Sequence, residues 1–130
     1  MPGKPKLPRP TDGELEILNV LWDRGPSTVR DVHAAICRAK PAQYTTVLKL
    51  LQIMSEKGLV RRDEAERAHV YQASRPREWT QRQLAADLLQ RGFGGSARSL
   101  MVGALSARRA SREELAEIRK LIEHYEKEAE

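Results

Sequence analysis

The spacing of apolar residues predicts three short helices in the first half of the chain. Apolar side chains recur every three or four positions within residues 11–25, 28–39 and 43–58, which is the periodicity of helices with one buried face. Thr11 and Thr28 each precede an acidic residue by three positions, the capping-box spacing of a helix start. We therefore expect three consecutive helices with short connections.

After Gly58 the period changes from helical to alternating. The glycine is expected to end the third helix, and residues 59–62 and 69–73 alternate on either side of a polar segment at residues 63–67. This pattern predicts a two-stranded hairpin. Three short helices followed by a hairpin are typical of a winged helix-turn-helix domain.

Residues 76–130 carry a helical pattern that glycines interrupt at residues 92–95 and that Ser96 and Ser111 can restart. Three such helices bury too little surface to be stable alone, so we expect them to pair with a second copy of the chain. The alternative is that they fold back onto their own winged helix. The residues expected at the interface between copies are Leu88, Leu89, Phe93, Leu100, Met101, Leu105, Leu115, Ile118, Leu121, Ile122 and Tyr125.

The first ten residues differ from the rest in composition, with four prolines, two lysines and one arginine. This composition disfavours a helix and predicts a flexible basic arm. The expected organisation is an arm at residues 1–10, a winged-helix domain at 11–75 and a helical dimerisation region at 76–130. The expected fold class is mainly α with a small β-hairpin.

Composition agrees with a helical fold and adds a basic charge. Hydrophobic residues make up 40% of the 130 residues and aromatic ones only 5%, so the core has to be built from aliphatic side chains. The net charge of +5 favours polyanions, although a solvated basic surface accounts for it equally well. No apolar run is long enough for a signal peptide or membrane span, so we expect a cytoplasmic protein without membrane insertion.

Residues that commonly carry chemistry are few and scattered. Cys37 is the single cysteine, and His33, His69 and His124 fall on separate predicted elements. No nucleophile motif, glycine-rich phosphate loop or paired metal ligands accompany them. We therefore expect no enzymatic activity, no cofactor and no metal.

The second and third helices form the expected helix-turn-helix, whose second member enters the major groove of DNA. The residues left on its outward or flanking faces, once core positions are removed, are Tyr44, Thr45, Thr46, Leu48, Lys49 and Gln52. Threonine offers a hydroxyl and a methyl, lysine can bond guanine and glutamine can bond adenine. For Thr45 and Thr46, capping of the helix start is the alternative role.

Basic residues flank this predicted recognition helix and are expected to neutralise DNA phosphates. They are Arg30, Lys57, Arg61, Arg62 and Arg67. Any one of them is more often a solvated surface charge, whereas Arg67 lies at the predicted hairpin tip, where a wing reaches the DNA backbone. Asp63, Glu64 and Glu66 weaken the positive field of the hairpin, so we expect the helix to contribute more than the wing.

Segments along most of the chain resemble the penicillinase-repressor (BlaI/MecI/CopY) family. The similar segments are residues 11–18 and 21–22, 44–47, 57–60, 68–71, 93–96 and 113–115. The resemblance implies a homodimeric transcriptional repressor that binds a dyad-symmetric operator of resistance or stress genes. It also implies that repression ends when a partner membrane sensor protease causes the chain to be cut near the start of the dimerisation region.

Two features depart from the family pattern. Proteolysed members carry an Asn-Phe bond at the candidate cleavage position, where this chain has Gly103-Ala104, which argues against the same cut. The C-terminal cysteine pairs of the copper-responsive branch are absent, which argues against a copper switch. The alternative from another class is a winged-helix protein-interaction module that binds no DNA.

Overall fold

The computed structural model describes residues 9–65 and 67–129. The chain divides into two compact units, residues 1–85 and 86–130. Helix α4 (Arg77–Phe93) contributes its first half to one unit and its second half to the other. The first unit thus extends beyond residue 75, where the sequence predicts a boundary. Most of the predicted arm, residues 1–8, lies outside the described residues, as does Glu66.

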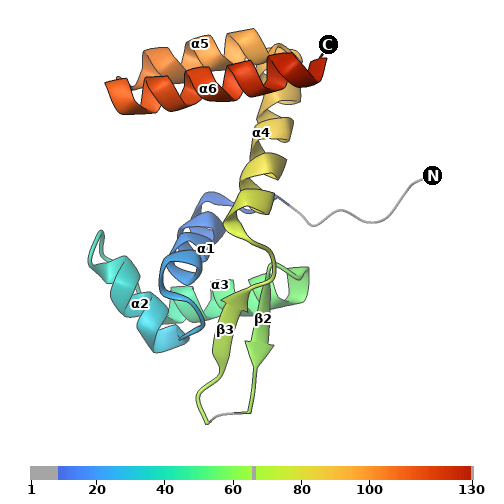
Figure 1. The fold of residues 1–130 in the computed structure, drawn as a ribbon. Helices are drawn as coiled ribbons and strands as arrows, with labels where there is room; N and C mark the ends of the chain where they lie inside the picture. The colour runs from blue at the N-terminus through green and yellow to red at the C-terminus, as the bar shows by residue number, and fades with distance from the viewer. Residues whose placement is uncertain (1–8, 66, 130) are drawn as a thin grey trace, which may run out of the picture. The chain divides into compact units, whose positions relative to one another are not determined.

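The first unit contains the three predicted helices. They are α1 (Asp12–Arg24), α2 (Val29–Cys37) and α3 (Tyr44–Lys57), all shown in Figure 1. Both predicted capping boxes are confirmed, because the Thr11 hydroxyl accepts the Glu14 N–H at 3.2 Å and the Thr28 hydroxyl accepts the Asp31 N–H at 3.1 Å. Gly58 ends α3 with a φ of 84°, a left-handed conformation that glycine adopts without strain and that turns the chain directly into the next strand.

The sheet has three strands, whereas the sequence predicts two. The predicted hairpin is formed by β2 (Val60–Asp63) and β3 (Val70–Ala73), and β1 (Ser27–Thr28) pairs with the other edge of β3. Both pairings are antiparallel, with Ser27 opposite Tyr71. The predicted hairpin is confirmed. Strand β1 is not predicted, because a strand of two residues is too short to produce an alternating pattern.

The core of the first unit is built by its helices together with the sheet. Its buried side chains are Ile17, Leu18, Leu21, Val29, Val32, Ile36, Val47, Leu51, Met54, Leu59, Val60 and Tyr71. Aliphatic side chains dominate, as the composition predicts. Since α3 directs Val47, Leu51 and Met54 into this core, its other side has to face solvent.

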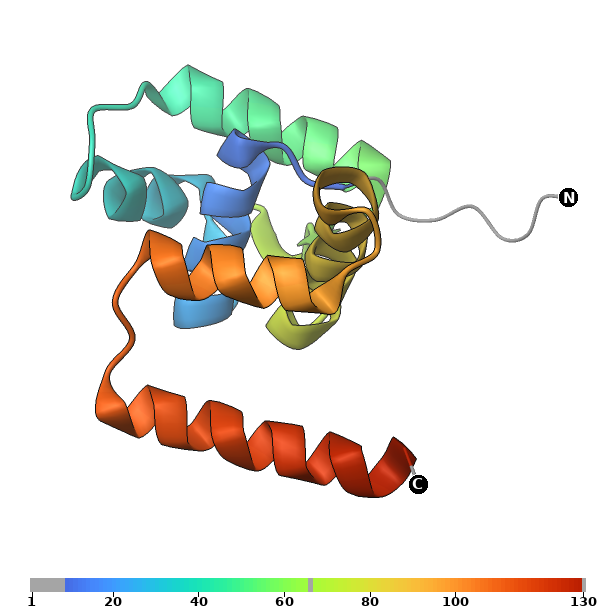
Figure 2. The same cartoon turned by 90° about the horizontal axis from the view of Figure 1, so that it is seen from above.

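The second unit consists of the end of α4 together with α5 (Ala97–Ala107) and α6 (Arg112–Ala129). Helices α5 and α6 run antiparallel and are joined by a short connection (Figures 1 and 2). The hydroxyls of Ser96 and Ser111 cap them by accepting backbone N–H groups at 3.1 and 3.0 Å. In the described part of the chain, α5 and α6 bury no side chain fully. Nor is any helix there long and apolar enough to cross a membrane.

Candidate nucleic-acid interface

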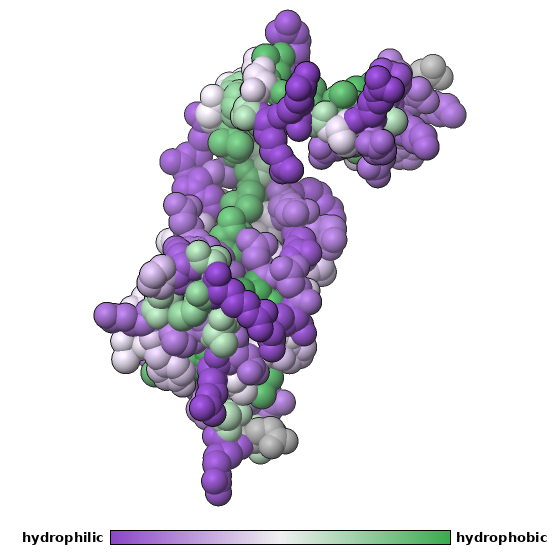
Figure 3. Space-filling view, turned by 90° about the vertical axis from the view of Figure 1, so that its left-hand side faces the viewer, coloured by the Kyte–Doolittle hydropathy of each residue, from purple (hydrophilic) through white to green (hydrophobic). Residues whose placement is uncertain are grey.

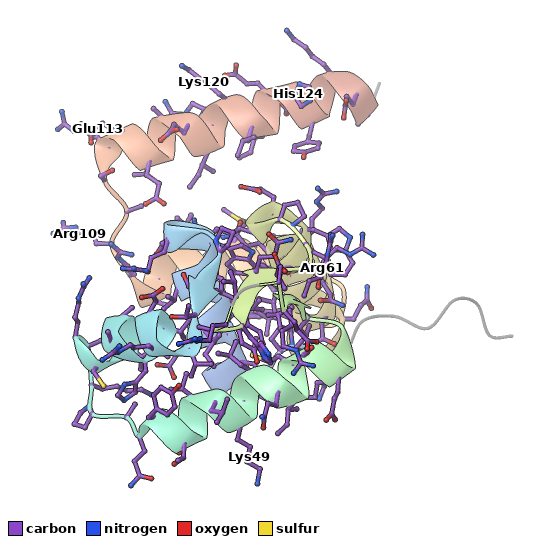
Figure 4. All side chains as sticks on the ribbon, turned by 90° about the horizontal axis from the view of Figure 1, so that it is seen from below. Lys49, Arg61, Arg109, Glu113, Lys120 and His124 are labelled. Atoms are coloured by element: carbon purple, nitrogen blue, oxygen red, sulfur yellow. The ribbon has the colours of Figure 1, made fainter. Side chains whose placement is uncertain are left out.

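The solvent side of α3 carries the residues that the sequence predicts to contact bases. Thr45, Thr46, Lys49 and Gln52 are exposed, and Tyr44 is 46% exposed. Leu48 lies at the edge of this face, partly buried against the core. Figure 4 shows the side chain of Lys49 extending away from the helices on which α3 packs.

The N-terminus of α3 is not covered by a capping side chain. The N-cap residue is Gln43, which makes no side-chain capping bond, and Thr45 and Thr46 lie inside the first turn. Thr46 donates its backbone N–H to the Gln43 carbonyl at 3.1 Å. The N-cap position thus belongs to Gln43 and to neither threonine. The positive end of the helix dipole stays accessible to an anion such as a DNA phosphate.

A groove of about 360 Å³ separates the solvent side of α3 from the hairpin. Tyr44, Leu48 and Gln52 line it from α3, and Arg62 and Arg67 line it from the hairpin. Arg30 and Thr28, at the start of α2, border the same groove. The structure therefore brings together base-reading candidates and three of the five predicted phosphate contacts.

Arg62, one of the cations that line the groove, is already paired with an acidic side chain. The Arg62 guanidinium donates to Glu64 Oε2 from Nε at 3.2 Å and from Nη2 at 3.0 Å. Hydrogen bonding to the Tyr71 side chain and then to Glu64 raises the pKa of Arg62, so the guanidinium keeps its charge. One of the three acids of the hairpin thus pairs with a predicted phosphate contact.

The other two predicted phosphate contacts lie outside the groove. Lys57 Nζ bonds Glu14 Oε2 at 2.8 Å, and Glu14 is 1% exposed, which gives Lys57 a structural partner in α1. Arg61 lines a second hollow together with Arg62, Asp63 and Gln72. Arg30, Arg62 and Arg67 therefore lie at the groove, and Lys57 and Arg61 lie outside it.

The residues that line the groove but are missing from the predicted set are Thr28, Val29, Ala68, His69 and Tyr71. The sequence predicts Thr28 as a helix cap and places His69 in the second segment of the hairpin. His69 precedes β3 and lies with its Nε2 3.8 Å from Glu64 Oε1. The alternating pattern of residues 69–73 puts His69 on the same face as Tyr71, and that signal identifies it as a groove residue.

The helices, the helix-turn-helix and the three-stranded sheet define a winged helix. A solution structure described as the DNA binding domain of the repressor BlaI matches with a TM-score of 0.50 and 22% identity, covering 55% of this chain and 88% of that one. The sequence model of the penicillinase repressor family matches residues 10–124. The chain belongs to the penicillinase repressor family, as its resemblance predicts.

One curated relative and one further solved structure are also similar to this chain. The transcriptional regulator BlaI of Mycobacterium tuberculosis is 42% identical over 67 residues, which are 51% of this chain and 49% of the relative. The solution structure of monomeric Bacillus licheniformis BlaI with the blaP half-operator matches with a TM-score of 0.49 and 22% identity, covering 56% of this chain and 89% of that one. The chain thus spans about half the length of the curated relatives it matches.

Proposed function

We propose that this protein is a transcriptional repressor that binds a dyad-symmetric DNA operator as a homodimer. The observation that carries the proposal is the groove between α3 and the hairpin, where Gln52 lies opposite Arg62 and Arg67. A recognition helix fits into the major groove of DNA, and cations on the wing can contact phosphates of the adjacent DNA backbone. Membership of the penicillinase repressor family supports the same reading.

Lys49 and Arg67 are expected to have different roles at the DNA. Lys49 projects from the middle of α3 away from the core (Figure 4), on the face that would meet the bases, so Lys49→Ala should reduce the preference for the specific site over random duplex. Arg67 lies on the wing, so Arg67→Ala should weaken binding to all sequences and reduce the salt slope by about 1.

The experiment first selects a binding site from a random duplex library with the wild-type chain. Fluorescence anisotropy then measures affinity for the selected and a scrambled duplex at several salt concentrations. Lys120→Ala and Arg119→Ala on α6 are the matched controls, because α6 belongs to the other unit. Absence of any selected site would contradict the proposal and favour the protein-interaction module, and equal losses for Lys49→Ala and Arg67→Ala would overturn the assigned roles.

The apolar surface of the second unit supports pairing of two copies. Large hydrophobic side chains are exposed there, with Leu121 at 56%, Ile122 at 53% and Tyr125 at 63%. Figure 3 shows green apolar surface among the charged side chains of these helices. A groove of about 450 Å³ lies between α5 and α6, lined by Met101, Ile118 and neighbouring residues. Contiguous exposed apolar surface of this kind marks an interaction site.

Light scattering tests the pairing directly. The wild-type chain should have the mass of two copies, and Leu121→Glu should have the mass of one, because it places a charge in the apolar face. The exposed neighbour Lys120 provides the control Lys120→Glu, which should remain dimeric. A monomeric wild-type chain would instead favour the alternative in which the helices fold back onto their own winged helix.

Release of repression by a membrane sensor protease, which the family resemblance implies, requires α5 to open. Gly103 and Ala104 lie inside this helix, and a helical backbone has to unfold locally before it is cut. Gly103 packs close to the Phe93 ring, so opening also separates α5 from the end of α4. Co-expression with the sensor protease, followed by mass spectrometry of the fragments, tests this proposal, and an intact chain would contradict it.

A further inference from the structure

The end of α1 is joined to the start of α4 by side-chain contacts outside the groove between α3 and the hairpin, and Trp22 also packs against the core of the first unit. The Trp22 Nε1–H donates to the Arg75 carbonyl at 3.0 Å. The Arg77 guanidinium forms an ion pair with Asp23 and lies 5.4 Å from the centre of the Trp22 ring. We call Trp22, Asp23, Arg75 and Arg77 the α1–α4 clamp.

Further contacts fix the first turn of α4 in place. Arg75 also lies 4.9 Å from the centre of the Trp79 ring, and Thr80, one turn into the helix, is only 4% exposed. These contacts all belong to the first unit. They therefore fix the direction in which α4 leaves the winged helix.

We propose that the α1–α4 clamp determines which half-site spacing the repressor accepts. The inference rests on the proposed function, because it requires two winged helices joined through their second units. Helix α4 is the continuous chain segment that connects each winged helix to its second unit. If the start of α4 could change direction relative to the winged helix, the distance between the two recognition helices of a dimer would vary. Fixing the start of α4 restricts that distance.

The clamp is separate from the surface that reads bases. Its members line none of the groove between α3 and the hairpin in the described structure. A change in the clamp should therefore leave affinity for one half-site intact and alter only the choice among spacings. A residue that merely stabilises the fold would change both affinities together.

The test uses the half-site selected with the wild-type chain, alone and as inverted pairs. The pairs are built at separations around one helical turn of DNA, about 10 base pairs centre to centre, in steps of about one base pair. The variants are Arg77→Gln and Asp23→Asn, whose side chains are partly or largely exposed, and thermal unfolding checks that they fold. Arg91→Gln is the matched control, because Arg91 pairs with Asp87 within α4.

The wild-type chain and Arg91→Gln should prefer one spacing. Arg77→Gln and Asp23→Asn should bind the single half-site within about twofold of wild type, while the preference for the best spacing falls by up to roughly fivefold, the weight of an exposed ion pair. An unchanged spacing preference would overturn the inference, as would equal losses on single and paired half-sites. Failure of the wild-type chain to bind any half-site would contradict the proposed function itself, and the inference with it.

Discussion

At the scale of single residues, Glu14 connects the start of α1 to the end of α3. Its carboxylate accepts the Thr11 N–H at 3.0 Å and the Lys57 ammonium at 2.8 Å. Burial raises the pKa of Glu14, but the hydrogen bonds and charge of Lys57 and the bonds from Thr11 outweigh burial and lower it overall. The carboxylate therefore stays ionised in the core and holds the recognition helix against α1.

Glu14→Gln should lower the free energy of unfolding at pH 7 by about 1–3 kcal/mol, because the amide can still cap Thr11 but leaves Lys57 without its anion. Since the native pKa is below the unfolded value of about 4.5, Glu14 stabilises the fold above that pH and loses this contribution as pH falls through the native pKa. Urea unfolding at several pH values measures both effects. The variant should lose less stability on acidification than wild type, and equal acid sensitivity would contradict the assignment.

Glu64 is expected to act as a competitor of DNA phosphate. It bonds Arg62, which lines the groove, so Glu64→Gln should free the guanidinium for a phosphate. Binding to random duplex should tighten, and the slope of log K against log salt should become more negative by about 0.9. Asp63→Asn removes the same charge one residue away and serves as control, because Asp63 accepts the Ala65 N–H rather than pairing with Arg62. Equal tightening by both variants would show a general charge effect and contradict the specific role.

At the scale of elements, α5 is weakened at its centre. Gly103 costs an α-helix roughly 0.5–1 kcal/mol relative to alanine. An added Cβ would lie 3.4 Å from Phe93 Cε1, at the limit of ordinary contact. Gly103→Ala should therefore stabilise α5 and slow its limited proteolysis, with fragment mapping as the measurement. Faster cleavage within α5 would show that the Phe93 ring cannot give way and would contradict this prediction.

The helix-forming elements could be predicted from the sequence because their signals are local. Thr11 and Thr28 are each followed by an acidic residue three positions later, and this spacing predicts the start of a helix. The strand β1 gives no such signal, because its two residues become a strand only when β3 lies beside them. The same reason explains Lys57: its charge suggested a phosphate contact, and only the fold reveals Glu14, 43 positions earlier in the chain, as its partner.

In the candidate interface, too, some features could be predicted from the sequence and others depend on the fold. The exposed residues of α3 follow from periodicity, since removing the buried stripe leaves Thr45, Lys49 and Gln52 on the surface. The groove between α3 and the hairpin could not be predicted, because its shape depends on how two separate elements pack. The pair of Arg62 with Glu64 needs side-chain geometry that residue type and spacing do not supply.

At the scale of the whole molecule, the two units differ in how much they bury. The first unit has a core of twelve buried hydrophobic side chains, whereas α5 and α6 fully bury none in the described residues. A unit without buried side chains gains little free energy from folding by itself. Folding of the second unit should therefore be coupled to pairing with a second copy.

This coupling predicts a thermal transition that depends on protein concentration. Because dimers are favoured by mass action, the Tm of the second unit should rise as the chain concentration is raised. Leu121→Glu should abolish this dependence and leave the transition of the first unit, whereas Lys120→Glu should preserve it. Circular dichroism melts over about a hundredfold concentration range provide the measurement. A wild-type Tm independent of concentration would contradict this coupling. It would mean that the exposed leucines and isoleucines of α6 are covered within one chain, because a stable helical unit has to bury such side chains.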